Sequence, residues 1–173
     1  FDRHFDQWKW STSDTGKGKI YNPIPKSREM AFFYSSGLQI KSFSRRALPF
    51  LKGFRYNMPH VSWTGYGARD FDRIFLTDLD AQEWSESIKD IQQSLDDSII
   101  RKAVQQLPKE IFPIRGETLI NKMISRRNLL TTRGMDYYKF ISKKVNIIGS
   151  NQKEYFKVSG TDRGIQVKVY ARA

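Results

Sequence analysis

Cysteine is absent from the 173 residues, and histidine occurs only twice, at His4 and His60. The sequence therefore excludes disulfides, thiolate zinc sites, cysteine nucleophiles and multi-histidine metal centres. Any metal would be held mainly by oxygen ligands, which suit magnesium, calcium or manganese. No apolar run approaches the roughly 18 residues of a membrane span, so no transmembrane helix is predicted.

Acidic residues are outnumbered, with 18 Asp and Glu against 30 Lys and Arg, a formal net charge of +12. Such a balance is compatible with an anionic ligand, lipid headgroups, an acidic partner chain or nucleic acid. The densest basic stretch, near four aromatic residues, consists of Lys41, Arg45, Arg46, Lys52 and Arg55. We interpret it as a solvated basic face rather than a nucleic-acid interface, because most surface charge has no dedicated ligand.

Aromatic residues make up 14% of the chain, which favours a folded domain over disorder. The chain opens at Phe1 with neither an initiator methionine nor a signal-peptide pattern. We therefore expect residues 1–173 to form one domain, or a fragment of a larger one. In either case the remainder of a longer parent chain is an expected partner.

The pattern changes twice along the chain, which gives sections 1–75, 76–150 and 151–173. The first section is aromatic-rich and irregular, with a hairpin-like turn at 15–19 and extended chain at 22–25. A short helix is also predicted within 38–51.

Residues 76–150 show helical periodicity. Asp80 and Glu83 form a capping-box pattern, and Asp96 or Asp97 starts a second helix. A third helical pattern follows Gly116, and Gly134 is expected to bend or divide it. The apolar positions predict one contiguous core formed by Trp84, Ile88, Ile91, Ile99, Val104, Ile120, Ile124 and Tyr138.

Apolar and polar residues alternate over 154–158 and 165–170, and a Gly-containing loop at 159–164 joins them. This pattern predicts a β-hairpin. The expected fold class is thus α+β and mainly helical, with an irregular aromatic N-terminal segment and a C-terminal hairpin.

The strongest candidate site lies at the beginning of the chain. Asp2 is followed five residues later by the amide of Gln7, and Glu29 comes 22 residues after that. In kinases, an aspartate at this spacing orients the substrate hydroxyl, while the amide and a second carboxylate ligate the metal. The competing interpretation is structural, with Asp2-Arg3-His4 supplying a buried ion pair and a capping histidine.

The sequence also resembles the C-terminal soluble region of Bacteroidetes-type cell-envelope proteins, which often carry a calcineurin-like phosphoesterase domain and an outer-membrane domain. That family typically has G-D-W-D-R-H-x-D-Q-W-R-W followed by P-I-P-R-D-R-D-x-A-F. The matching segments here are Asp2-Arg3-His4, Asp6-Gln7-Trp8-Lys9-Trp10, Pro23-Ile24-Pro25 and Ala31-Phe32, with further matches at Phe71-Asp72-Arg73, Arg126-Arg127 and Tyr137-Tyr138. The D-R-H-x-x-Q core additionally resembles the D-R-H-x-x-N loop of HipA-like and phosphatidylinositol-kinase-like enzymes.

The resemblance implies the C-lobe of a kinase-like fold in a protein of the cell envelope. Asp2 would be the catalytic base, Gln7 and Glu29 the metal ligands, and Mg²⁺ and ATP the cofactors of the full-length parent. The family's D-R-D is Ser27-Arg28-Glu29 here, so one acid is missing. We therefore expect neither cofactor to bind these residues tightly, and the isolated fragment to be inactive. The family's phosphoesterase chemistry requires His, Asp and Asn ligands that this chain does not supply.

Two alternatives remain open. The chain could be a non-catalytic interaction module that keeps a kinase-like core as a scaffold. The acidic residues Asp70, Asp72, Asp78 and Asp80 could hold calcium, although they lack the glycine and closing glutamate of a calcium loop. For His60 and the four tryptophans we expect structural roles.

Overall fold

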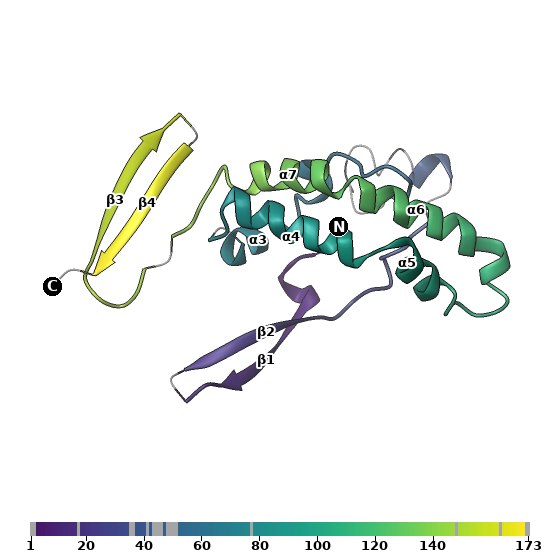
Figure 1. Ribbon diagram of the computed structural model, residues 1–173, viewed down its shortest axis with the longest axis horizontal. Helices are drawn as coiled ribbons and strands as arrows, with labels where there is room; N and C mark the ends of the chain where they lie inside the picture. Colours follow the sequence, from purple (N-terminus) through teal and green to yellow (C-terminus); the bar gives the residue numbers. More distant parts are fainter. Residues whose placement is uncertain are drawn as a thin grey trace.

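The computed structural model has an α+β fold, a body of helices with two antiparallel β-hairpins attached (Figure 1). It describes residues 3–16, 18–34, 37–40, 42, 47, 52–76, 78–147, 149–162 and 164–171. Among these, no helix combines the length and the apolar character needed to cross a membrane.

The helical body consists of α2 (Val61–Thr64), α3 (Arg69–Phe75), α4 (Ala81–Ser94), α5 (Asp97–Val104), the π-helical turn η3 (Phe112–Gly116), α6 (Glu117–Asn128) and α7 (Leu130–Ile141). In Figure 1, α6 and α7 follow one another along one side of the body and α3, α4 and α5 lie along the other. The principal packing is of α4 against α7 and of α5 against α6. Helices α2 and α3 lie in the section that the sequence predicts to be irregular, so that prediction is wrong for residues 61–64 and 69–75.

The predicted helix starts are confirmed. The Asp80 carboxylate accepts from the backbone N–H groups of Gln82 and Glu83, and the Glu83 carboxylate accepts from the Asp80 N–H, which completes a capping box. Asp96 is the cap of α5 and accepts from the Ile99 N–H at 2.8 Å. These side chains satisfy N–H groups that have no partner within the helix.

The third helical pattern is divided at Leu129 rather than at Gly134. Gly134 lies inside α7 and allows the close approach of α4. A Cβ at this position would lie 2.4 Å from Cδ1 of Ile88, too close for any real contact. Trp84 reinforces the same contact by donating from its indole nitrogen to the Gly134 carbonyl at 3.1 Å.

The principal buried cluster lies between α5 and α6 and contains Ile100, Val104 and Ile120. Ile88, Val104 and Ile120 are buried as predicted, and Ile124 packs on this cluster. The core prediction is wrong for Ile91 and Ile99, whose side chains are 48% and 46% exposed. Both lie on the outer edges of their apolar stripes, and Ile100, which the prediction omitted, occupies the core with 2% exposure.

The first hairpin joins β1 (Trp8–Asp14) to β2 (Lys19–Pro25), which confirms the turn predicted at 15–19. Gly16 has a φ of 75°, and the Thr15 N–H donates to the Gly18 carbonyl at 2.9 Å. The hairpin follows a single 3₁₀ turn, η1 (Phe5–Gln7), and projects from the helical body (Figure 1). Of the short helix predicted within 38–51, residues 38–40 and 42 are helical and most of the remainder lies outside the described residues.

The C-terminal hairpin is also confirmed, with β3 (Glu154–Thr161) paired to β4 (Gly164–Ala171). Both strands extend further into the predicted loop than expected. In Figure 1 this hairpin stands apart from the helices at the end of a long connection.

The core assignment can be tested with two adjacent isoleucines of α5. Ile100→Ala should lower the free energy of unfolding by about 2–5 kcal/mol, because it removes buried methylenes and leaves a cavity. Ile99→Ala is the matched control and should cost clearly less, since about half of that side chain is already in water. Urea denaturation of both variants measures the difference, and equal costs would contradict this placement of the core.

Candidate functional site

The 3₁₀ turn η1 and the first hairpin bring Lys26, three residues before Glu29, back to Gln7. The Gln7 N–H donates to the His4 carbonyl at 3.0 Å, so Gln7 closes the turn that begins the hairpin. After the chain returns through β2, the Lys26 N–H donates to the Gln7 carbonyl at 2.8 Å. Glu29 follows three residues later, in a turn closed by the Ala31 N–H and the Arg28 carbonyl. The hairpin thus returns Lys26 to Gln7, with Glu29 one short turn further on.

In the described part of the chain, the side-chain amide of Gln7 has a partner near its nitrogen but none for its oxygen. Its amide nitrogen lies 3.4 Å from Nε2 of His4, but its amide oxygen is buried and has no hydrogen-bond partner among the described residues. An unsatisfied buried acceptor costs roughly 1–3 kcal/mol, so such an oxygen is expected to meet a ligand or water. Of the two predicted site residues that the structure describes, Gln7 is the one whose side-chain oxygen is buried without a partner.

Of the other two predicted site residues, the structure describes Glu29 but not Asp2. Glu29 is exposed, which leaves its carboxylate accessible from solvent. Asp2, the predicted catalytic base, lies outside the described residues. Among the described residues, no group of three or more His, Asp or Glu side chains gathers as a metal site, so Gln7 and Glu29 would need a further ligand.

Arg3, the residue that follows Asp2, is held by a buried polar cluster. Its guanidinium forms an ion pair with Asp72 of α3, and the Tyr137 hydroxyl of α7 donates to the same carboxylate oxygen at 2.5 Å. The Asp72 side chain is almost fully buried, whereas Arg3 is about half exposed. The structural interpretation expected a buried ion pair from Asp2-Arg3-His4; Arg3 instead pairs with Asp72, 69 residues away, and Asp2 lies outside the described residues. The predicted histidine cap is not made, because the His4 side chain accepts no hydrogen bond from a backbone N–H of η1.

Burial dominates the electrostatics of this cluster. Removal from water raises the pKa of Asp72, and the positive charge of Arg3 and the hydrogen bond from Tyr137 only partly offset that effect. The pKa of Tyr137 is raised as well, first by burial and then by its hydrogen bond to Asp72. The tyrosine therefore remains a hydrogen-bond donor throughout the physiological pH range.

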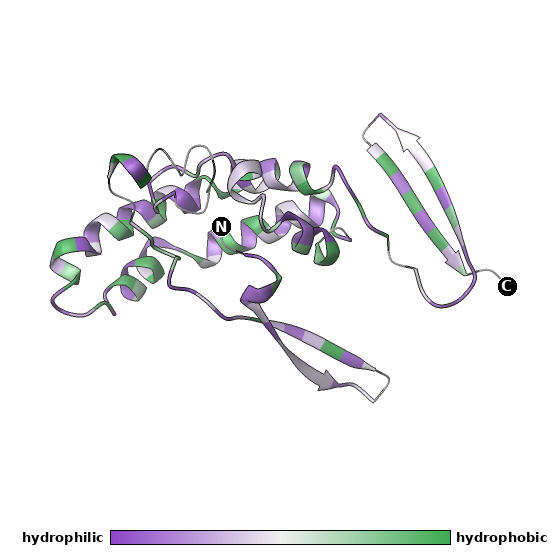
Figure 2. Cartoon of the chain, turned by 180° about the vertical axis from the view of Figure 1, so that it is seen from behind, coloured by the Kyte–Doolittle hydropathy of each residue, from purple (hydrophilic) through white to green (hydrophobic). Residues whose placement is uncertain are grey.

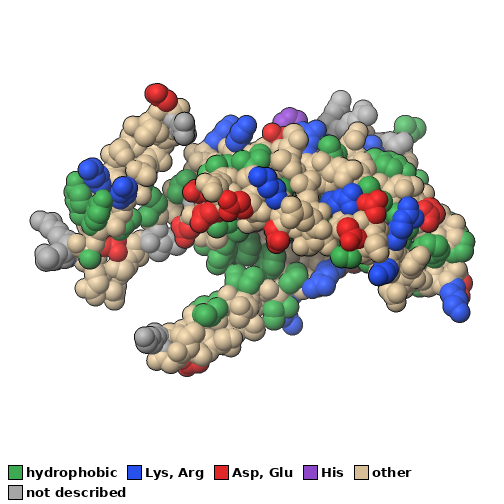
Figure 3. All heavy atoms as spheres, in the orientation of Figure 1, with side chains coloured by type: hydrophobic (Ala, Val, Ile, Leu, Met, Phe, Trp, Pro, Cys, Tyr) green, Lys and Arg blue, Asp and Glu red, His purple; other side chains and the backbone are tan. Residues whose placement is uncertain are grey.

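The aromatic residues around η1 pack against α3. The rings of Trp8 and Phe71 are stacked at 5.1 Å and 6°, and Phe5 meets Phe71 edge-on at 5.2 Å. Trp10 lies 5.0 Å from Phe75, and Figure 3 shows apolar side chains gathered where this hairpin meets the helices. The predicted structural role is supported for these two tryptophans and for Trp84, whose indole is hydrogen-bonded to α7.

Among the described residues, the remaining candidates do not gather as a metal site. Within the acidic group proposed for calcium, Asp72 is engaged by Arg3, Asp80 caps α4, and Asp70 pairs with Arg69 and Arg73. His60 is exposed and its Nδ1 lies 3.2 Å from the Ser62 hydroxyl, which fits a structural role. Much of the predicted basic patch lies outside the described residues, including Lys41, Arg45 and Arg46.

Sequence reasoning missed the partners of Arg3. The sequence offers Asp72 as a candidate calcium ligand and as part of the matching segment Phe71-Asp72-Arg73, and it offers Tyr137 only as part of that resemblance. Nothing in the spacing links residues 3, 72 and 137, because the contact depends on α3 and α7 packing together.

Comparison with protein-family models, with curated proteins and with solved structures yields no match to this chain. The kinase-like interpretation therefore depends on the residues and their geometry.

The raised pKa of Asp72 predicts a specific pH dependence. Between the ordinary value of 3.8 and the raised value, the folded protein binds more protons at Asp72 than the unfolded chain does. This contribution to folding stability therefore grows as the pH falls through the raised pKa, and it is lost as the pH rises. The unfolding free energy of the wild type, minus that of Asp72→Asn, should increase on acidification.

Chemical denaturation of both proteins at a series of pH values measures that difference. Asp70→Asn, on the same helix with a mostly exposed carboxylate, is the control and should not reproduce the trend. A difference that shrinks on acidification would mean that the ion pair with Arg3 outweighs burial.

Proposed function

We propose that residues 2–29 form the metal-binding part of a kinase-like phosphotransferase site in a cell-envelope protein. One observation carries the proposal: a hairpin begins directly after Gln7 and returns the chain to it at Lys26, three residues before Glu29. This arrangement would allow an amide ligand and a carboxylate that are distant in sequence to approach the same metal ion. The unpartnered oxygen of Gln7 supports its role as a ligand.

In this site Asp2 would orient the substrate hydroxyl and accept its proton, while the Gln7 oxygen and the Glu29 carboxylate would hold Mg²⁺. The ion pair between Arg3 and Asp72 would fix the backbone beside Asp2. Mg²⁺ would neutralise charge on the phosphates of ATP when bound. A complete kinase-like site also requires a lysine-bearing nucleotide lobe, which this proposal assigns to the remainder of the parent protein.

Metal binding provides the test, with Mn²⁺ as a paramagnetic probe that accepts the same oxygen ligands. We expect Mn²⁺ to broaden the backbone amide NMR signals of Gln7 and of residues 26–29 first. Gln7→Leu and Glu29→Gln should each weaken this effect severalfold. Broadening that leaves these signals unaffected, or that persists in both variants, would contradict the proposal.

A gain of binding is also expected. Ser27→Asp restores the acid that the resembling family carries, so it should tighten Mn²⁺ binding severalfold by adding a charged oxygen ligand. Ser159→Asp introduces the same charge on the exposed strand β3 and serves as the control. Equal effects of the two variants would mean that only net charge matters.

A second candidate function, a non-catalytic interaction module, is favoured by the C-terminal hairpin. Its register places Phe156, Val158, Val167 and Val169 on one face, with Ile165 at the turn end of that face. Figure 2 shows the corresponding alternation of apolar and polar residues along β4. Val158 and Ile165 are 65% and 77% exposed, so much of this face is left for a partner.

This candidate predicts that the apolar face contributes little to the stability of the chain itself. The double substitution of Val158 and Ile165 by threonine should leave the unfolding midpoint nearly unchanged, because both side chains are already in water and threonine retains β propensity. Thermal denaturation followed by circular dichroism measures the midpoint. A loss as large as that of Ile100→Ala would show that the face is buried within this chain.

A further inference from the structure

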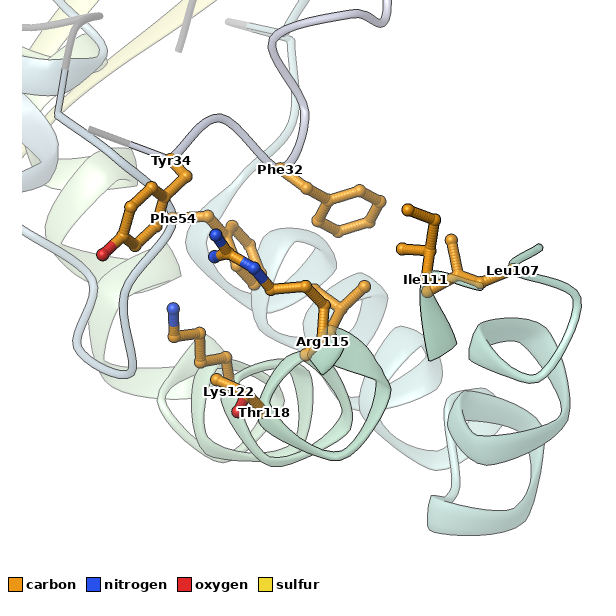
Figure 4. Close-up of a pocket in the computed structure, with 9 residues that line it drawn as sticks. Phe32, Tyr34, Phe54, Leu107, Ile111, Arg115, Thr118 and Lys122 are labelled. Carbon is orange, nitrogen blue, oxygen red and sulfur yellow. The ribbon is translucent and has the colours of Figure 1, made fainter. Parts of the chain in front are cut away.

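A pocket of about 270 Å³ lies between the segment around residues 32–34 and the helical elements η3 and α6. Its volume is close to the lower end of the range for small-molecule sites. The lining residues are Phe32, Tyr34, Phe54, Leu107, Ile111, Arg115, Thr118, Leu119 and Lys122. Figure 4 shows Phe32 on one side, facing Ile111 and Leu107, and Tyr34 on the other.

The aromatic wall is built by contacts between separate segments. The Phe54 N–H donates to the Phe33 carbonyl at 2.7 Å, which ties the two segments together. The rings of Phe32 and Phe54 meet edge-on at 5.1 Å, and the guanidinium of Arg126 lies 4.3 Å from the Phe54 ring centre. The wall is therefore fixed by the fold, although Phe32 and Tyr34 remain more than half exposed.

Positive charge is placed at one side of this apolar space. Arg115 lies 4.4 Å from the Tyr34 ring centre, and in Figure 4 the side chains of Arg115 and Lys122 rise from the helices toward that ring. Neither cation forms an ion pair within the described part of the chain, and none of the lining residues is acidic. Arg115 stacks on Tyr34 and the Lys122 amine lies 5.9 Å from the Tyr56 ring centre, so the pocket combines an apolar wall with two cations that have no carboxylate partner among the described residues.

We propose that this pocket binds a single-chain anionic amphiphile, with its apolar chain against Phe32, Leu107 and Ile111 and its anionic head at Arg115 and Lys122. Burial of the chain supplies the nonspecific part of the affinity. The guanidinium of Arg115 can form charge-assisted hydrogen bonds with a carboxylate or a phosphate, and Lys122 adds a point charge. This site is separate from the proposed metal site and does not depend on it.

Calorimetric titration of the full chain tests the proposal, with probes kept below their micelle concentrations. Decanoate and decyl phosphate should each bind one site saturably, and the tighter of the two identifies the head group. Decanol, which lacks the charge, should bind at least tenfold more weakly. Equal binding of decanol and both anions, or the absence of saturable binding, would overturn the proposal.

Three variants locate the binding. The double variant Arg115→Gln with Lys122→Gln should weaken both anions at least tenfold and leave decanol unchanged. Ile111→Trp should fill the pocket and abolish binding of all three probes. Lys102→Gln removes an exposed charge from α5 and should change nothing, which controls for the net charge of +12.

Folding of each variant is checked by circular dichroism, and the charge variants alter only exposed or half-exposed side chains. Binding that survives Ile111→Trp in a folded protein would place the ligand elsewhere and refute the assignment. A loss of anion affinity in Lys102→Gln equal to that of the double variant would refute it as well, because attraction to net charge would then suffice.

Discussion

A carboxylate that is removed from water must be compensated, and Asp72 imposes this requirement on two distant parts of the chain. Its nearly buried side chain is met by Arg3 from the N-terminal segment and by Tyr137 from α7. Removing one partner from such a group leaves the other polar atoms uncompensated. The ion pair therefore determines where the N-terminal segment lies, and the stacking of Trp8 on Phe71, one residue before Asp72, holds it in the same place.

The features proposed to be functional depend on this docking. Because Arg3 and Trp8 are both anchored to α3, the intervening turn η1 is fixed at both ends, and Gln7 lies within it. The hairpin that follows can project from the body without disturbing that turn. A metal site at Gln7 would therefore be organised by its attachment to the helices, although none of its proposed ligands belongs to a helix of the body.

The segment formed by η3 and α6 organises the proposed ligand pocket. η3 and α6 carry the buried cluster on one side, through Ile120, and the pocket residues Arg115 and Lys122 on another. The same helical segment thus contributes both to the core and to the proposed ligand site. The C-terminal hairpin contributes to neither, and its exposed apolar face is the feature that best suits an interaction with another chain.

Local chemistry was predictable from the sequence. The capping side chains Asp80 and Asp96, the turn around Gly16 and the alternation in the C-terminal hairpin are all decided by residues within a few positions of each other. The tertiary structure decided the rest. Periodicity defines an apolar stripe but not its buried centre, so it could not distinguish Ile100 from its exposed neighbour Ile99. Similarly, Gly134 was expected to interrupt a helix, but it lies inside α7, where the lack of a side chain leaves room for Ile88 of α4. The pairing of Arg3 with Asp72 and Tyr137 left no local signal, because it arises only when α3, α7 and the N-terminal segment pack together.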